Sequence, residues 1–219
     1  MDMDRPTALV HEYIERMMAW LLFVEPDSVP VRQALQLGLG AGSLTKFCHK
    51  ELHMKTTAIE LNPQVLTACR GWFKLPAENA RLQVVLADAA VEIQDPRWWG
   101  AVDALQVDLY DNHAAAPVQD SLPFYIHCRR LLTSDGCMTV NLFGRASSFA
   151  RTVEKITAAF GERAVWAFKP TREGNTVVLA QRTRSRPKRE LLTTRADIIQ
   201  ARWGLPAAKW VRVFKPVLS

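Results

Sequence analysis

Residues 37–43 read Leu-Gly-Leu-Gly-Ala-Gly-Ser and overlap a short apolar stretch, residues 34–39. An apolar stretch of this length is typical of a buried strand, and the residues after the glycines predict a helix. Glycines between a strand and a helix let the backbone turn tightly and approach a ligand without an intervening side chain. The first N–H groups of the helix are free to bind that ligand. The motif therefore predicts a binding loop at Gly38, Gly40 and Gly42.

Strands and helices alternate through the rest of the chain. Further strands are predicted at residues 57–61, 82–87, 102–107, 136–142, 165–168 and 176–180. Helices are predicted at residues 7–24, 44–50, 89–93, 122–132 and 146–160, with one more that begins at Pro63. Such alternation indicates a parallel sheet with helices on both faces, and the last two strands should form an antiparallel edge hairpin. We predict an α/β, doubly wound, mostly parallel seven-stranded sheet followed by a C-terminal helical tail.

The composition is that of a soluble globular protein, with 48% hydrophobic and 23% charged residues among 219. This excludes a disordered chain, a collagen-like repeat and a coiled coil. The apolar run at residues 17–24 is shorter than the roughly 20 residues of a membrane span, and the acidic N-terminus is unlike a secretory signal. We therefore expect a cytoplasmic protein. No Cys-x-x-Cys pair exists, so we expect no metal site and reduced core thiols at Cys48, Cys69, Cys128 and Cys137.

Basic residues concentrate near the C-terminus. Residues 182–219 hold ten Lys or Arg and two acids, whereas residues 1–181 carry a net charge of −2. The run at residues 182–189 contains no aromatic residue, so we favour a solvated linker over its alternative, a contact with nucleic acid. Apolar residues beyond the linker have helical spacing and predict a tail that packs on the body, namely Ile198, Ile199, Trp203 and Trp210.

The chain is expected to have three parts. Residues 1–30 form an N-terminal helix and linker, and residues 31–181 form the α/β domain. Residues 182–219 form the basic linker and the helical tail.

Acidic residues follow the second and third predicted strands where these strands end. Glu60 lies about 20 residues after the glycine loop, where an acid can accept hydrogen bonds from both ribose hydroxyls. Asp88, beside Ala89, can accept a hydrogen bond from an adenine amino group. Helix capping is the structural alternative for both acids. Ligands of open α/β sheets bind at the carboxyl ends of the strands, so the pattern predicts a nucleoside site.

The fourth predicted strand runs into Val107-Asp108-Leu109-Tyr110-Asp111-Asn112. Two carboxylates here would attract a cationic amine, and one of them could accept its proton as the amine attacks. The alternative is a turn in which Asp111 and Asn112 only cap the backbone. A further acid, Asp120, is expected to cap the next helix.

These motifs together resemble the spermidine synthases and their short relatives, a family with the class I S-adenosylmethionine-dependent fold. The resemblance covers about residues 13–181, and Tyr13 and Glu15 match the family pattern before the sheet. It implies that Glu60 holds the ribose, and that Asp88 and Ala89 hold the adenine. It also implies that Asp108 is the proton acceptor, and that the amine substrate is bound by Asp111, Tyr110 and Tyr13.

The sequence departs from the family pattern at several positions. Ala41 stands where the family usually has an Asp that holds the aminopropyl ammonium of decarboxylated S-adenosylmethionine. Ile14 replaces a polar residue, and residues 112–117 replace Pro-x-Gly-Pro. About 30 residues precede the first strand, so we expect this chain to lack the family's N-terminal β-hairpin domain. The loss at Ala41 leaves two donors open, decarboxylated S-adenosylmethionine and S-adenosylmethionine itself.

Three functions are compatible with the sequence. The favoured one is aminopropyl transfer to a di- or polyamine, which makes a small-molecule amine the partner. The second is methyl transfer from S-adenosylmethionine, and the third is a non-catalytic nucleoside-binding module with a basic tail. A dehydrogenase is disfavoured because Ser43 breaks the dinucleotide fingerprint. No membrane partner is expected, and a homodimer is one assembly that the resemblance allows.

Overall fold

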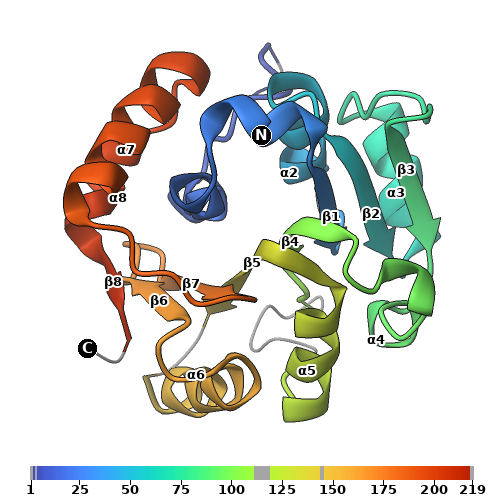
Figure 1. Ribbon diagram of the computed structural model, residues 1–219. Coiled ribbons are helices and arrows are strands. Elements are labelled where there is room, and N and C mark those ends of the chain that lie inside the picture. Colours follow the sequence, from blue (N-terminus) through green and yellow to red (C-terminus); the bar gives the residue numbers. More distant parts are fainter. Residues whose placement is uncertain (1, 3, 111–118, 144–145, 218–219) are drawn as a thin grey trace.

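A computed structural model describes residues 2, 4–110, 119–143 and 146–217. The strands are β1 (Gln33–Leu37), β2 (Lys55–Glu60), β3 (Leu82–Leu86), β4 (Val102–Val107), β5 (Leu132–Phe143), β6 (Val165–Phe168), β7 (Asn175–Gln181) and β8 (Phe214–Pro216). In the described residues they form one eight-stranded sheet of order β3-β2-β1-β4-β5-β7-β6-β8 (Figure 1). Pairing is parallel from β3 to β5 and antiparallel from β5 to β8. The predicted fold class is confirmed, and the tail adds β8 as an eighth strand.

Helices cover both faces of the sheet. The α-helices are α1 (Glu12–Arg16), α2 (Ser43–Lys46), α3 (Pro63–Gly71), α4 (Ala89–Glu92), α5 (Leu122–Leu131), α6 (Ala146–Phe160), α7 (Arg189–Trp203) and α8 (Ala207–Val213). Shorter helical turns are η1 (Ala19–Phe23), η2 (Pro26–Val31), η3 (Phe47–Glu51) and η4 (Pro96–Trp98). One hydrophobic cluster packs α5 and α6 against the sheet, and another packs η1, α7 and α8 against it (Figure 1). No helix in the described part of the chain combines the length and apolar character needed to cross a membrane.

The predicted amphipathic helix at residues 7–24 is wrong. Only α1 is α-helical there, and the chain continues as the 3-10 turn η1. Residues 17–22 are buried on every side, because they lie between the sheet and α7. A segment without a solvent face gains nothing from helical periodicity, so tertiary packing sets its backbone. Arg16 anchors the turn by donating a hydrogen bond from Nη1 to the carbonyl oxygen of Lys169, at 2.5 Å.

The C-terminal tail packs on the body, as predicted. Ile199 and Trp210 are buried, and Trp203 packs against the same cluster. Arg195 on α7 donates from Nη1 to the carbonyl oxygen of Leu22, at 3.1 Å. The ring of Phe214 in β8 stacks on Phe168 of β6, with 4.5 Å between the ring centroids. The tail is therefore part of the same folded body and of the same sheet.

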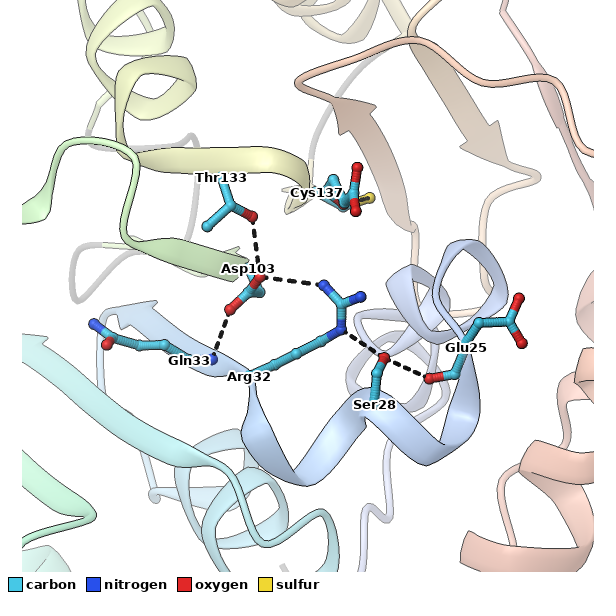
Figure 2. Close-up of polar contacts among 8 residues, drawn as sticks. Glu25, Ser28, Arg32, Gln33, Asp103, Thr133 and Cys137 are labelled. Carbon is cyan, nitrogen blue, oxygen red and sulfur yellow. Dashed lines mark hydrogen bonds and ion pairs between the residues drawn. The ribbon is translucent and has the colours of Figure 1, made fainter.

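A polar network fixes the amino end of β1 to β4 and β5 (Figure 2). Asp103 is its centre, since Oδ2 accepts from the backbone N–H of Gln33 at 2.8 Å. Its Oδ1 accepts from Arg32 at 3.1 Å and from the Thr133 hydroxyl at 3.0 Å. Arg32 also donates to the Ser28 hydroxyl at 3.0 Å. Asp103 is thus a structural acid at the opposite end of the strands from the glycine loop.

Arg182 is not part of a solvated linker, so that prediction is wrong for this residue. Its Nη1 lies 3.0, 3.2 and 2.9 Å from the carbonyl oxygens of Arg129, Arg130 and Leu132. The last carbonyl groups of a helix have no N–H partner within the helix. A cation near them also interacts favourably with the negative end of the helix dipole. Arg182 therefore caps the C-terminal end of α5. Arg184, two residues on, is exposed as predicted.

Replacing Arg182 by Ser should lower the free energy of unfolding by about 1–2 kcal/mol, because carbonyl groups at the end of α5 lose a charged donor. Chemical unfolding followed by circular dichroism measures the change. Arg184→Ser is the matched control and should leave the midpoint unchanged. Equal midpoints for the two variants would contradict the capping role.

Candidate active site

A pocket of about 680 Å³ opens at the carboxyl ends of β1, β2 and β4. It is lined by eight residues that the sequence singled out, namely Tyr13, Gly38, Gly40, Glu60, Asp88, Ala89, Asp108 and Tyr110. Gly42 lies just behind the lining, at the start of α2. Asp111 lies outside the described residues, so its predicted role remains a prediction. The structure thus brings together residues from five separate stretches of the chain.

Gly38 is required by the close approach of two strand ends. Its φ is +91°, a value that L side chains rarely adopt. A Cβ atom at this position would lie 2.4 Å from the carbonyl oxygen of Asp108. The glycine therefore lets the end of β1 lie directly against the end of β4, where the acidic residues emerge.

Glu60 is held rigidly between the glycine loop and α3. Its Oε2 accepts from the backbone N–H of Leu39 at 3.0 Å, and its Oε1 accepts from the N–H of Asn62 at 2.8 Å. The capping alternative does not apply, because Asn62 is the residue that caps α3, through a 2.9 Å bond to the N–H of Gln64. The fixed carboxylate faces the pocket with acceptor capacity left for hydroxyl groups.

Asp88 both caps a helix and lines the pocket. Its Oδ1 accepts from the backbone N–H of Ala90 at 2.8 Å and so caps α4. The capping alternative is therefore observed, but one carboxylate can accept several hydrogen bonds. The cap orients the carboxylate at the pocket rim, beside Ala89.

Asp108 is a partly buried carboxylate in the wall of the pocket. Burial raises its pKa, while a hydrogen bond from Asn141 and an interaction with the Tyr13 hydroxyl oppose that rise. The Asn141 Nδ2 atom lies 3.0 Å from Oδ1 of Asp108. The hydroxyl of Tyr110 donates to the main-chain oxygen of Asn141 at 2.7 Å and forms part of the same wall. A shielded carboxylate with a raised pKa is suited to accepting a proton from a bound group.

Among the lining residues that sequence reasoning missed are two buried asparagines, Asn141 near the end of β5 and Asn175 at the start of β7. A polar residue inside an otherwise apolar strand was the available signal. The expectation for Asp120 is wrong, because Ser121 caps α5. Asp120 instead joins α5 to α6 by accepting from Lys155 at 2.7 Å.

The fold, with its pocket at the carboxyl ends of the parallel strands, is that of the class I methyltransferase-like proteins. Human methyltransferase-like protein 13, solved in complex with SAH, superposes with a TM-score of 0.76 at 20% identity, over 92% of both chains. A probable spermidine synthase from Corynebacterium glutamicum gives a TM-score of 0.73 at 20% identity, over 97% of this chain and 80% of the other. At such identity these similarities establish the fold.

Sequence comparison establishes the family. No family model matches the chain. This chain is 32% identical over 209 residues to the polyamine aminopropyltransferase of Neisseria meningitidis. The aligned stretch covers 94% of this chain and 76% of that protein. The chain belongs to the polyamine aminopropyltransferase family.

Proposed function

We propose that this chain transfers an aminopropyl group from decarboxylated S-adenosylmethionine to an amine nitrogen of a di- or polyamine. Family membership supports a transferase that uses an adenosyl-sulfonium donor. In this reaction the amine nitrogen bonds to the donor methylene carbon next to sulfur, and the carbon–sulfur bond breaks. The bonding electrons stay on sulfur, so methylthioadenosine leaves as a neutral thioether. The proton lost from the amine is accepted by Asp108.

The other site residues take roles that match their chemistry. Glu60 binds the ribose hydroxyls, and Asp88 with Ala89 binds the adenine. The backbone of Gly38, Gly40 and Gly42 lets the donor approach the sheet. The phenols of Tyr13 and Tyr110 and the carboxylate of Asp111 bind the amine substrate, the last as a partner for its cationic end.

The charge of the pocket is the observation that favours the decarboxylated donor. Three carboxylates line it, at Glu60, Asp88 and Asp108, and none of the described lining residues is Lys, Arg or His. Decarboxylated S-adenosylmethionine carries two positive charges, whereas S-adenosylmethionine also carries a carboxylate that needs a donor or a cation. Opposite charges attract strongly in a partly desolvated site, so this pocket favours the more cationic molecule. Ala41 stands in place of the family's Asp, so one partner for the ammonium group of the decarboxylated donor is missing. The alanine supplies no cation that could bind the carboxylate of S-adenosylmethionine.

Isothermal titration calorimetry with three nucleosides tests the donor. Decarboxylated S-adenosylmethionine should bind at least tenfold more tightly than S-adenosylmethionine, and methylthioadenosine should bind measurably. Tighter binding of S-adenosylmethionine would support methyl transfer instead. No binding of any of the three would mean that the nucleoside site is no longer functional and would contradict the proposal.

Glu60→Ala should weaken methylthioadenosine binding by about 1.5–3 kcal/mol, the range for hydrogen bonds to a charged group. Asp88→Ala should act in the same direction, and it should also lower thermal stability because α4 loses its cap. Calorimetry measures both, with Glu51→Ala as the control at an exposed glutamate outside the pocket. If both variants bind like the parent protein, the nucleoside assignment is wrong.

A further inference from the structure

A chain of side-chain hydrogen bonds leads from Asp108 into the sheet. Asn141 Nδ2 donates to Asp108 Oδ1 at 3.0 Å, and Asn175 Nδ2 donates to Asn141 Oδ1 at 3.1 Å. Only 3% of Asn141 and 9% of Asn175 is exposed. Both asparagines line the pocket, from the neighbouring strands β5 and β7. Buried amides in contact with a reactive carboxylate call for an explanation beyond packing.

The chain has a fixed direction. A carboxamide has one end that only donates and one end that only accepts. Because Asn175 donates to Oδ1 of Asn141, the NH₂ end of Asn141 must face Asp108. Asn175 is held in turn by its own backbone, which accepts from the N–H of Thr171 at 2.8 Å and donates to the Thr171 hydroxyl at 3.2 Å. The β6–β7 turn thus holds the backbone of Asn175 in place, beside Asn141.

We propose that Asn141 and Asn175 are positioning residues that aim the carboxylate of Asp108 at the amine nitrogen and keep it able to accept the proton. This proposal rests on the proposed function, which gives Asp108 that task. Asn141 acts on Asp108 directly, and Asn175 acts only through Asn141. Neither residue needs to exchange a proton itself.

The hydrogen bond from Asn141 changes the pH at which Asp108 loses its proton. Burial raises the pKa of Asp108, and the Asn141 hydrogen bond lowers it, because that bond stabilises the charged form. In the described part of the chain, the titratable groups that interact with Asp108 are two phenols, Tyr13 of α1 and Tyr110 after β4. Burial raises the pKa of both phenols, so neither ionises near neutral pH. Removing the amide donor should therefore raise the pKa of Asp108 further.

A merely structural role makes a different prediction. Backbone hydrogen bonds already join β5 to β7 from Cys137 to Phe143. If the asparagines only supported that pairing, their loss would lower thermal stability and leave the pH dependence unchanged. Thr176→Val is a matched control, because Thr176 is the next residue on β7, is buried, and does not line the pocket.

The test compares the pH dependence of kcat/KM in Asn141→Leu, Asn175→Ala, the double variant and Thr176→Val. Asn141→Leu should move the acidic limb to higher pH and lower kcat at neutral pH by tenfold or more, with donor affinity unchanged. Asn175→Ala should give a smaller shift in the same direction. The double variant should match Asn141→Leu alone, because residues that act in series are not additive. Thr176→Val should leave the limb unshifted.

Carboxyl-carbon NMR of Asp108 in the substrate-free protein gives a second measurement that needs no activity. The pKa of Asp108 should rise in Asn141→Leu and, by less, in Asn175→Ala. An unchanged titration of Asp108 in the Asn175→Ala variant, or additive effects in the double variant, would overturn the proposal that Asn175 acts on Asp108 through Asn141. If the parent protein shows no aminopropyl transfer, the proposed function fails, whereas the NMR titration still decides whether the asparagines control Asp108.

Discussion

Asp108→Asn should lower kcat by about a hundredfold or more, because it keeps the shape of the side chain and removes the proton acceptor. The affinity for methylthioadenosine, which is neutral at sulfur, should change little, since we propose that the nucleoside is bound by Glu60 and Asp88. Steady-state kinetics with a diamine, together with calorimetry of methylthioadenosine binding, measures both effects. Full turnover in this variant would rule out Asp108 as the general base. Asp111→Asn provides the contrast, because loss of a partner for the amine should raise KM for that substrate.

The same substitution should stabilise the substrate-free protein at neutral pH. The pKa of Asp108 in the folded chain is raised above its ordinary value of 3.8. The folded state therefore binds this proton more tightly than the unfolded state does. As the pH rises from about 4 through the folded pKa, the ionised carboxyl group increasingly lowers the free energy of unfolding. The neutral amide of the Asp108→Asn variant carries no such penalty. Melting temperatures should be higher for this variant at pH 7 and should converge with those of the parent protein near pH 4. A lower melting temperature at pH 7 would show that Asp108 supports the fold.

Trp210→Ala should lower the free energy of unfolding by about 3–5 kcal/mol. Trp210 on α8 is 2% exposed and makes a T-shaped contact with the Phe168 ring, with 6.3 Å between the centroids. A cavity at this position would loosen the tail from β6, and such a loss is large beside a typical stability of about 5–15 kcal/mol. Chemical unfolding measures the change.

Trp72→Ala is the control for that experiment, because the Trp72 side chain is 72% exposed. It should change the free energy of unfolding by no more than about 0.5 kcal/mol. Equal midpoints for the two tryptophan variants would mean that the tail contributes little to the folded body. Deletion of residues 183–219 should have a still larger effect than Trp210→Ala, because it also removes β8 and the Arg195 contacts.

Most of the sheet could be predicted because the parallel strands contain short, largely apolar stretches that alternate with helices. Prediction from the apolar pattern failed before β1, where residues 17–22 are apolar throughout. Such a segment has no alternation of polar and apolar residues from which its secondary structure could be predicted. It also failed at Arg182, because the carbonyl groups that this side chain caps lie about fifty residues away in α5. Contacts between distant segments leave no local pattern in the sequence.

The gathering of three acidic residues at one pocket could be predicted for a physical reason. Parallel strands end at one edge of the sheet, so Glu60, Asp88 and Asp108 had to lie near one another. Asn141 and Asn175 could not be placed in the same way. They meet through the antiparallel register of β5 and β7, which pairs Asn141 with Val177 and Phe143 with Asn175. A shift of one residue in that register would separate the two side chains.

The most direct test of the central claim is product analysis by mass spectrometry. The protein is incubated with a diamine and either decarboxylated S-adenosylmethionine or S-adenosylmethionine, with Asp108→Asn as the inactive control. We predict methylthioadenosine and an aminopropylated amine in equal amounts from the decarboxylated donor, and no methylated amine from the other. A methylated amine from S-adenosylmethionine, with no aminopropylated amine from the decarboxylated donor, would contradict aminopropyl transfer.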